Sequence, residues 1–514
     1  MCSNFQAVLL TLAVSSLSAC TTSGGSAVSA RAALPALRPS GPVHGVIKDK
    51  HWLVPEAETL KVDGNLAVFA SQEIDVEGAL EIEKPGISLA LFAPTIIING
   101  GIGSGYKGTT LTGQSKVADV ISGCDVRLLS ASRVASAQGD DLAVSASGPA
   151  CRLYVGTNSA LGGGLGLDGT AQQGLRDATD GGSLYVGTKY AIDAAEHLAR
   201  GDGVKRKAYE PATVVLGDGA ILYGGSGGNG GSVNGVYVPP PADRWIFQPG
   251  IGGDGGSVFI AAGKLEALPG MPAGAIVAGG NGGTGGGAAL SKYDQLNGTS
   301  AHADGYDAKV IEGSGGQGGS VDVASNTPNF HYEAGNGGNA GTVTVAGGNG
   351  AQTPVGNGGN LTLNFGLIGD SGEGTRNPRQ EPHDGAYPPI TFVGGEGGTA
   401  PNGTTAAGGN GGTLTVFGPG KVLPQGYQVT IGDFGDAGFG QSACGSAGAR
   451  GGNGGNLTLE HGVTLANIDL LVGHSYFNGG NGGFGTPPGS GGTGGIVNTT
   501  GAKIGQDGMA GSQC

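Results

Sequence analysis

The sequence predicts an all-β solenoid of short stacked strands, and three observations lead to that prediction. Glycine makes up 112 of 514 residues, whereas aromatic residues reach 5% and charged residues 13%, which is far from an ordinary globular composition. Hydrophobic residues still amount to 38%, and Val, Ile and Leu recur in short runs with the alternation of half-buried strands. The third observation is internal repetition. A thin core built from repeated short strands is consistent with all three observations.

The repetition is clearest early in the chain, where the segment 66–78 matches the segment 89–100 after a one-residue deletion. Leu66 and Leu89 are 23 positions apart, and Ile74 and Ile96 are 22 apart. A unit of two short strands cannot bury its apolar face alone, so it must stack on copies of itself. A coil of about 22 residues resembles the right-handed parallel β-helix of exported bacterial proteins, a fold with few short helices.

After residue 224 the repeat becomes a glycine segment followed by an alternating strand, as in 252–260, 315–323, 408–416 and 451–459. Alternation places Val258, Val321, Leu414 and Leu457 on the buried face and sends Asp322, Thr415 and Thr458 outward. We expect the GGxGG segments to turn tightly, with glycine supplying positive φ and close backbone approach. The 43-residue spacing of Leu414 and Leu457 would then span two coils. The alternative is that the glycine segments are unstructured.

Four regions follow from this pattern: a signal peptide at 1–19, a Ser/Ala/Gly/Pro tether at 20–45, a solenoid with loop insertions at 46–223, and a GGxGG solenoid at 224–514. The apolar run 5–17 has the length of a signal-peptide core and is too short to span a bilayer. The tether has no periodicity that could bury a face.

Leu17-Ser18-Ala19-Cys20 resembles the lipobox of bacterial lipoproteins. That resemblance implies cleavage before Cys20, acylation of Cys20 with fatty acids such as palmitate, and a stable membrane anchor. Thr21 stands where an Asp is associated with inner-membrane retention, so the resemblance implies the outer membrane. It does not distinguish the periplasmic from the surface-exposed face.

Charge and cysteine content narrow the partners and the compartment. A net charge of −14 argues against nucleic acid, because phosphate binding needs basic patches. Apart from Cys2 and Cys20, the chain has Cys124, Cys151, Cys444 and Cys514. These four are disulfide candidates with three pairings, the nearest-neighbour one being Cys124 with Cys151 and Cys444 with Cys514. Export to an oxidising compartment would permit disulfides.

One insertion, 236–247, concentrates aromatic residues in a chain with two Trp. Tyr237, Asp243, Arg244 and Trp245 could supply a flat aromatic face and polar partners for a sugar. This favours a structural or adhesive, glycan-binding role in the envelope, with polysaccharide or other envelope components as partners. The alternative for the insertion is that its rings plug an irregular coil.

Metal and catalytic signals are weak, so we expect no cofactor and no enzyme activity. The segment 451–459 resembles the calcium-binding nonapeptide of RTX proteins, which leaves calcium open, but Asn456 stands where that motif has a ligand Asp. Asp140-Asp141 and His474 resemble two motifs of polygalacturonase-like hydrolases, without the other motifs. The 333 positions from Asp141 to His474 predict about fifteen coils between them. A polysaccharide-processing hydrolase or lyase is the alternative function, by analogy of fold alone.

Overall fold

The fold is described from a computed structural model of the chain. The residues that it describes are 42–106, 117–146, 148, 150–172, 175–188, 190–191, 193–194, 212–234, 236–238, 244–247, 249–267, 274–285, 288–289, 308–310, 315–325, 331–338, 343–344, 361–365, 367–368, 375–376, 390–398, 407–417, 429–440, 447–460 and 462–513. The predicted signal peptide and lipobox lie outside them. The first strand starts at Val43, within the predicted tether.

The protein is nearly all parallel β-structure, with one 26-stranded sheet that winds round an axis. Three ladders of parallel strands make up this sheet, and we name them ladders 1 to 3. The long strands β1 (Val43–Val54) and β2 (Thr59–Val76) bend through corners and contribute to all three. The all-β prediction is therefore confirmed.

Ladder 1 continues through β4 (Leu89–Phe92), β7 (Ala118–Gly123), β10 (Asp141–Ala146), β13 (Leu184–Val186), β19 (Val258–Ala262), β24 (Val321–Ser325), β27 (Leu361–Phe365), β31 (Leu414–Phe417) and β33 (Leu457–Glu460). Ladder 2 continues through β5 (Thr95–Ile98), β8 (Asp125–Leu128), β11 (Arg152–Val155), β14 (Thr213–Leu216) and β20 (Lys264–Ala267). Ladder 3 continues through β3 (Ala79–Ile82), β6 (Gly101–Ser104), β9 (Arg133–Ala135), β12 (Ala160–Gly162), β15 (Ile221–Tyr223), β21 (Ile276–Ala278), β25 (His331–Ala334), β30 (Ile390–Gly394), β32 (Val429–Phe434) and β34 (Ile468–Leu470).

Three small sheets lie outside the ladders. They contain β16 (Val233–Asn234), β22 (Ala288–Ala289) and β26 (Val343–Thr344); β17 (Val236–Val238), β18 (Arg244–Phe247) and β23 (Ala308–Val310); and β28 (Leu367–Ile368) with β29 (Thr375–Arg376). Helix is scarce among the described residues. Residues 190–191 and 193–194 are helical, and η4 (Leu465–Asn467) is a short 3-10 turn. Ala191 packs on the outer face of ladder 1 against Ala143.

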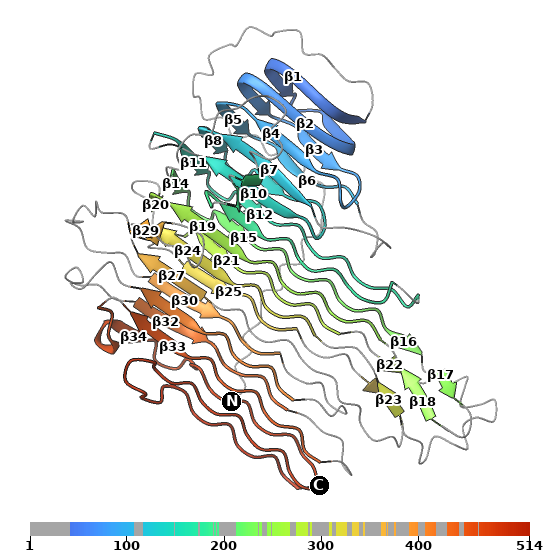
Figure 1. Cartoon of the computed structure of the whole chain (residues 1–514), viewed down its shortest axis with the longest axis vertical. Helices are drawn as coiled ribbons and strands as arrows, with labels where there is room; N and C mark the ends of the chain where they lie inside the picture. Colours follow the sequence, from blue (N-terminus) through green and yellow to red (C-terminus); the bar gives the residue numbers. More distant parts are fainter. Residues whose placement is uncertain are drawn as a thin grey trace, which may run out of the picture. The chain divides into compact units, whose positions relative to one another are not determined.

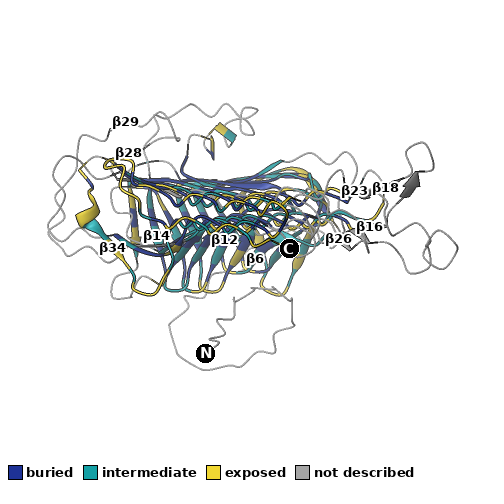
Figure 2. Ribbon diagram, turned by 90° about the horizontal axis from the view of Figure 1, so that it is seen from below, coloured by how far each residue is buried: buried dark blue, intermediate teal, exposed yellow. Residues whose placement is uncertain are grey.

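The core is the space that the ladders enclose, filled by every second side chain of each strand. Val258, Leu414 and Leu457 are fully buried and Val321 is 1% exposed, which confirms the predicted inward face. Figure 2 shows the buried residues gathered in the interior and the exposed ones on the outer rims. Period-2 alternation therefore sets the inside and outside of each strand, as it does in any sheet with one buried face.

The length of a turn changes along the chain. Leu66 pairs with Leu89, a turn of 23 residues, but Leu184 pairs with Val258, 74 residues on. Leu414 pairs directly with Leu457, so their spacing of 43 is one turn and the prediction of two coils was wrong. The regular 22-residue coil holds only for the first turns, because later turns carry additional segments between their strands. One of these recurs turn after turn at the same corner.

That corner lies between each ladder 3 strand and the next ladder 1 strand. It is short between β9 and β10, but from β12 onward the chain runs out in a glycine-rich segment and returns in another (Figure 1). We call these paired segments the glycine array. Its outgoing segments are 163–170, 224–231, 279–284, 335–338, 395–398, 435–440, 478–485 and 505–512, and its returning segments are 175–182, 249–256, 315–319, 407–412, 447–455 and 489–495. The array begins at Gly163, inside the region predicted to be the N-terminal solenoid.

Hydrogen bonds in the array repeat every three residues. In the GGx unit of Gly227, Gly228 and Asn229, the first N–H donates to Asn281 O in the next outgoing segment (2.8 Å). The second donates to Thr179 O in a returning segment (3.0 Å). The third donates to the side chain of Asp168 in the previous outgoing segment (2.7 Å). This three-residue period, with no bonds inside a segment, is that of a polyproline II helix. The glycine segments are thus ordered, and the unstructured alternative was wrong.

Close approach of backbones explains why two of every three residues are glycine. A Cβ on Gly227 would lie 1.9 Å from Gly253 O, and one on Gly228 would lie 2.1 Å from Leu167 O. Neither glycine has a left-handed φ, so the expectation of tight turns with positive φ was wrong for these segments. Positive φ occurs where a strand passes into the array, as at Gly394 and Gly435.

The third residue of each unit, x, completes the pattern through its side chain. Asp254 Oδ1 accepts the N–H of Gln317 one turn on (2.7 Å), and Gly255 donates its own N–H to Gln317 O (2.8 Å). We call this two-point contact the side-chain clamp. It recurs at Asp168–Asn229, Asp177–Ile251, Asp180–Asp254, Ser183–Ser257, Asn229–Thr284, Ser257–Ser320, Asn281–Asn336, Asn336–Glu396, Asn410–Asn453, Asp436–Asn478, Asn453–Thr493, Asn456–Ile496, Asn478–Gln506 and Asn481–Met509.

The identity of residues in glycine positions changes at the two ends of the array. In the first outgoing segment, Leu167 and Thr170 stand where the next segment has Gly228 and Gly231. In the last, Asp507 stands where the previous segment has Gly479, and its Oδ1 accepts the N–H of Gly494 (2.8 Å). Side chains are thus admitted where no further segment stacks, which is how repeat proteins close their ends.

Gly228→Ala should destabilise the protein strongly, because its methyl group would overlap a carbonyl of a neighbouring rigid segment. Overpacking of this kind costs about 1–3 kcal/mol or more, so the midpoint of urea unfolding should fall. Gly103→Ala is the matched control, since nothing lies within 4 Å of a Cβ at Gly103. Equal stability of the two variants in urea titrations would contradict the close-packed array.

Candidate functional site

The aromatic insertion forms a hairpin at the far end of the glycine array. The chain enters it from the outgoing segment 224–231 through β16, and leaves it into the returning segment 249–256. Figure 1 shows β16, β17, β18, β22 and β23 together at the end of the extended segments away from the ladders. The array therefore holds this hairpin away from the hydrophobic core.

Backbone pairing fixes which predicted site residues the hairpin brings together. Tyr237 lies directly opposite Trp245 in the antiparallel pair of β17 and β18, and Val238 lies opposite Arg244. Trp245 is also the partner of Ala308 in β23. Asp243, the fourth predicted residue, lies outside the described residues. Two aromatic residues eight positions apart in sequence are thus neighbours.

The two carboxylates of the hydrolase-like motif accept hydrogen bonds from backbone N–H groups. Asp140 accepts the N–H of Val117 at Oδ1 (2.9 Å) and that of Gly86 at Oδ2 (3.0 Å). Asp141 Oδ1 accepts the N–H of Ser183 (2.6 Å). Asp140 is fully buried and Asp141 is 8% exposed. These two carboxylates join neighbouring turns at the corner where the array begins, so their role there is structural.

His474 is far from this corner. Only six strand-to-strand steps of ladder 1 separate β10 from β33, so the prediction of about fifteen coils was wrong. Six steps still amount to roughly 29 Å at the spacing of paired strands. Nδ1 of His474 pairs with Asp433 (3.1 Å) near the last strand of ladder 3. The two carboxylates and this histidine cannot act on one bond.

A third aspartate of the same corner, Asp119, was not singled out in the sequence. Its Oδ1 accepts the N–H of Leu89 (2.7 Å), and its Oδ2 lies 2.7 Å from Ser136 Oγ. Ser136 Oγ is also 2.7 Å from Asp141 O. A hydroxyl has one proton to donate, so Ser136 Oγ donates it either to Asp119 Oδ2 or to Asp141 O. Asp119 Oδ2 also accepts the N–H of Ala137 (3.3 Å). Burial raises the pKa of Asp119 to about 7, although the hydrogen bonds from Leu89, Ser136 and Ala137 act in the opposite direction.

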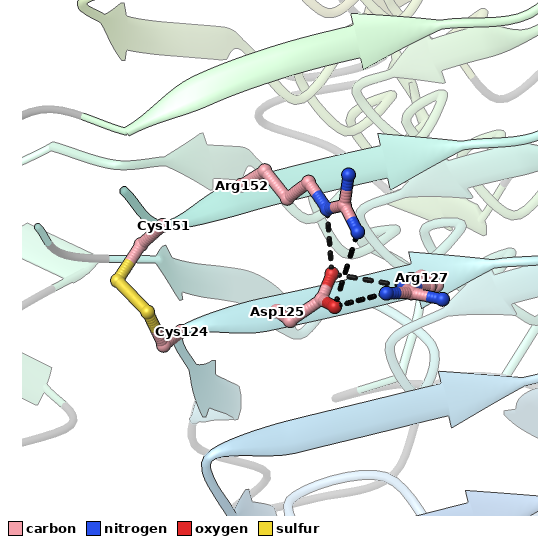
Figure 3. A network of polar contacts seen from close by, with 5 residues as sticks. All are labelled: Cys124, Asp125, Arg127, Cys151 and Arg152. Carbon is pink, nitrogen blue, oxygen red and sulfur yellow. Dashed lines mark hydrogen bonds and ion pairs between the residues drawn. A yellow bond between two sulfur atoms is a disulfide. The ribbon is translucent and has the colours of Figure 1, made fainter. Parts of the chain in front are cut away.

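A disulfide and an ion-pair network join β8 to β11 (Figure 3). Cys124 is bonded to Cys151, one of the two nearest-neighbour pairs; Cys444 and Cys514 lie outside the described residues. Asp125 accepts hydrogen bonds from Arg127 Nε (3.0 Å) and Arg152 Nε (3.0 Å). The Arg127 hydrogen bond, followed by that of Arg152, lowers the pKa of Asp125 to about 2. This outer face is tied across turns covalently and electrostatically.

The described residues offer little that would hold a metal or a small ligand. They contain no group of three or more His, Cys, Asp or Glu side chains placed for a metal ion. Asn456, in the RTX-like segment, accepts the N–H of Ile496 (3.1 Å) and so belongs to a side-chain clamp. A void between ladders 1 and 2, lined by Val144, Leu153, Val186 and Val214 among others, has no room for a water molecule.

Comparison with known proteins gives no assignment: no family model, curated protein or solved structure matches the chain. Within the described part of the chain, no helix has the length and apolar character needed to cross a membrane. The side-chain clamps were not predicted from the sequence. Their signal is the recurrence of Asn, Asp or Ser at x, residue types whose side-chain oxygens accept backbone N–H groups.

Asp119 predicts a stability that falls as the pH rises. Its folded pKa lies above the unfolded value of 3.8, so the folded state holds the proton more tightly and loses this advantage between about pH 4 and pH 7. Asp119→Asn replaces the carboxyl by an amide that does not titrate, so it should flatten this dependence. Urea unfolding from pH 4 to pH 8 measures it.

Asp254→Asn is the control, since it removes one negative charge but keeps the acceptor oxygen of an exposed clamp. It should leave the pH dependence close to that of the parent. An Asp119→Asn curve parallel to the parent curve would show that the side chain is ionised throughout.

Proposed function

We propose that the chain is a lipid-anchored envelope protein of the bacterial outer membrane, with a structural and adhesive role. In this proposal Cys20 carries the lipid and palmitate is among its acyl chains. The solenoid and its array then act as a rigid body that presents the hairpin of Tyr237 and Trp245 to a glycan. We also propose the right-handed coil of exported parallel β-helices for the three ladders.

The observation that carries the adhesive part is the placement of the hairpin. Tyr237 and Trp245 are cross-strand partners. Aromatic residues are the residue type that stacks on a sugar ring. The array that leads to them has its backbone groups engaged, so it is suited to hold the hairpin in place.

Two further features support export. The disulfide of Cys124 and Cys151 is typical of oxidising compartments, and Leu17 to Cys20 have the lipobox pattern. The alternative of a polysaccharide-processing enzyme gains no support among the described residues, because Asp140 and Asp141 are hydrogen-bonded to backbone N–H groups.

Cys20→Ala should abolish incorporation of labelled palmitate in a bacterial host and release the protein from the membrane fraction, because the thiol that takes the lipid is gone. Cys2→Ala should label like the parent and controls for the loss of a cysteine. Palmitate label retained in the Cys20→Ala protein would overturn the lipoprotein assignment.

Trp245→Ala should weaken binding of the signal-less protein to its best glycan on an array, with the melting temperature nearly unchanged. Loss of one stacking ring corresponds to about 0.5–1.5 kcal/mol, or about a two- to thirteenfold loss of affinity. Phe484→Ala, an exposed ring of the array, should leave binding unchanged. A ring that plugs a coil would instead destabilise the protein by about 3–5 kcal/mol on removal, and that result would contradict a binding role.

A further inference from the structure

The array has a chemical weakness in its own sequence. Its x residue often supplies an acceptor oxygen, and the next residue is in most units glycine, so the repeat contains many Asn-Gly pairs. In a free chain the glycine nitrogen of such a pair attacks the asparagine side-chain carbon, ammonia leaves, and a succinimide ring forms. Water then opens the ring to aspartate or isoaspartate. Glycine permits the reaction best because no side chain hinders its nitrogen.

The structure holds both reacting groups of these pairs in one clamp. At Asn281, Oδ1 accepts the N–H of Asn336 (2.8 Å), and the N–H of Gly282 donates to Asn336 O (2.8 Å). The electrophilic amide and the nucleophilic nitrogen are therefore both hydrogen-bonded to the same residue of the next turn. The same arrangement holds at Asn229, Asn336, Asn410, Asn453, Asn478 and Asn481.

We propose that the side-chain clamp shields the asparagines of the array from spontaneous deamidation. Ring closure requires the asparagine side-chain carbon to reach the following nitrogen, and that nitrogen must lose its proton. In the clamp the N–H is already donated to a carbonyl, and the side-chain oxygen is held by a different N–H. Both bonds must break first, so the reaction proceeds only from locally opened states, whose population is small in a well-bonded segment.

The two products explain why this protection matters to the fold. Aspartate keeps an acceptor oxygen at x, as Asp168, Asp180 and Asp254 do in intact clamps. Isoaspartate adds a carbon to the main chain, which shifts every following residue out of the three-residue period. A Cβ added to the glycines of the array would lie near 2 Å from a carbonyl oxygen of a neighbouring segment. Packing this close leaves no room for such a shift. One isoaspartate would therefore disrupt several neighbouring segments.

The first test uses the unmodified chain, incubated at pH 8 and 37 °C with and without urea. Peptide mapping by mass spectrometry, with separation of isoaspartyl peptides, follows each clamped asparagine. We expect deamidation at Asn229, Asn281, Asn336 and Asn478 to be at least roughly tenfold slower in the folded protein, because only opened states react. Equal rates in the two conditions would overturn the proposal.

The second test removes one bond of one clamp. Thr284 donates its N–H to Asn229 Oδ1 (3.0 Å), and proline at 284 lacks that N–H while its φ suits a polyproline II segment. Thr284→Pro should speed deamidation at Asn229 several-fold and leave Asn281 as slow as in the parent. Thr284→Ala is the matched control, because it removes the hydroxyl contact to Asn229 (2.7 Å) but keeps the N–H.

Each outcome of the second test bears on the proposal. Faster loss of Asn229 in Thr284→Pro than in Thr284→Ala supports the clamp as the shield. An unchanged rate at Asn229 in Thr284→Pro would show that the clamp does not control the reaction. Acceleration at every asparagine alike would show general unfolding of that variant, and the comparison in urea on the parent chain then decides.

Discussion

The constraint on which the glycine array depends is that every backbone N–H must find an acceptor where no strand pairing exists. A polyproline II segment forms no internal hydrogen bonds, and a buried N–H without a partner is strongly disfavoured. Carbonyls of two neighbouring segments take the two glycine N–H groups, and a side-chain oxygen takes the third. The side-chain clamp thus completes such a unit, and in the described clamps the acceptor at x is Asn, Asp or Ser.

The same constraint accounts for the abundance of glycine. Glycine loses more conformational freedom on folding than any other residue, so a chain this rich in it needs a compensating gain. The gain here is close packing of backbone on backbone, in which a Cβ at Gly227 would lie 1.9 Å from a carbonyl oxygen. The array resembles a core in its density of contacts, yet it contains hydrogen bonds where an ordinary core has apolar side chains.

The corner at Asp119, Asp140 and Asp141 also contains backbone N–H groups that need acceptors outside strand pairing. Here the ladders give way to the first array segment, and Gly164 donates its N–H to Asp140 O (3.0 Å). The carboxylates accept backbone N–H groups of Leu89, Val117 and Ser183 that have no strand partner at that point. The raised pKa of Asp119 follows from its burial in this network, because structural networks also shift pKa values.

The sequence by itself determined the all-β fold and the inward face of the strands, because alternation of Val258, Val321, Leu414 and Leu457 is a local property of two-residue period. It did not determine the length of a turn, because a 43-residue spacing is compatible with one turn or two until the partner of Leu414 is known. Tertiary structure alone decided that GGx units lie in layers, since the side-chain clamps join residues 28 to 74 positions apart. It also decided that Asp140 accepts backbone N–H groups and that Tyr237 pairs with Trp245 in a hairpin, because each depends on a neighbour that sequence distance does not reveal.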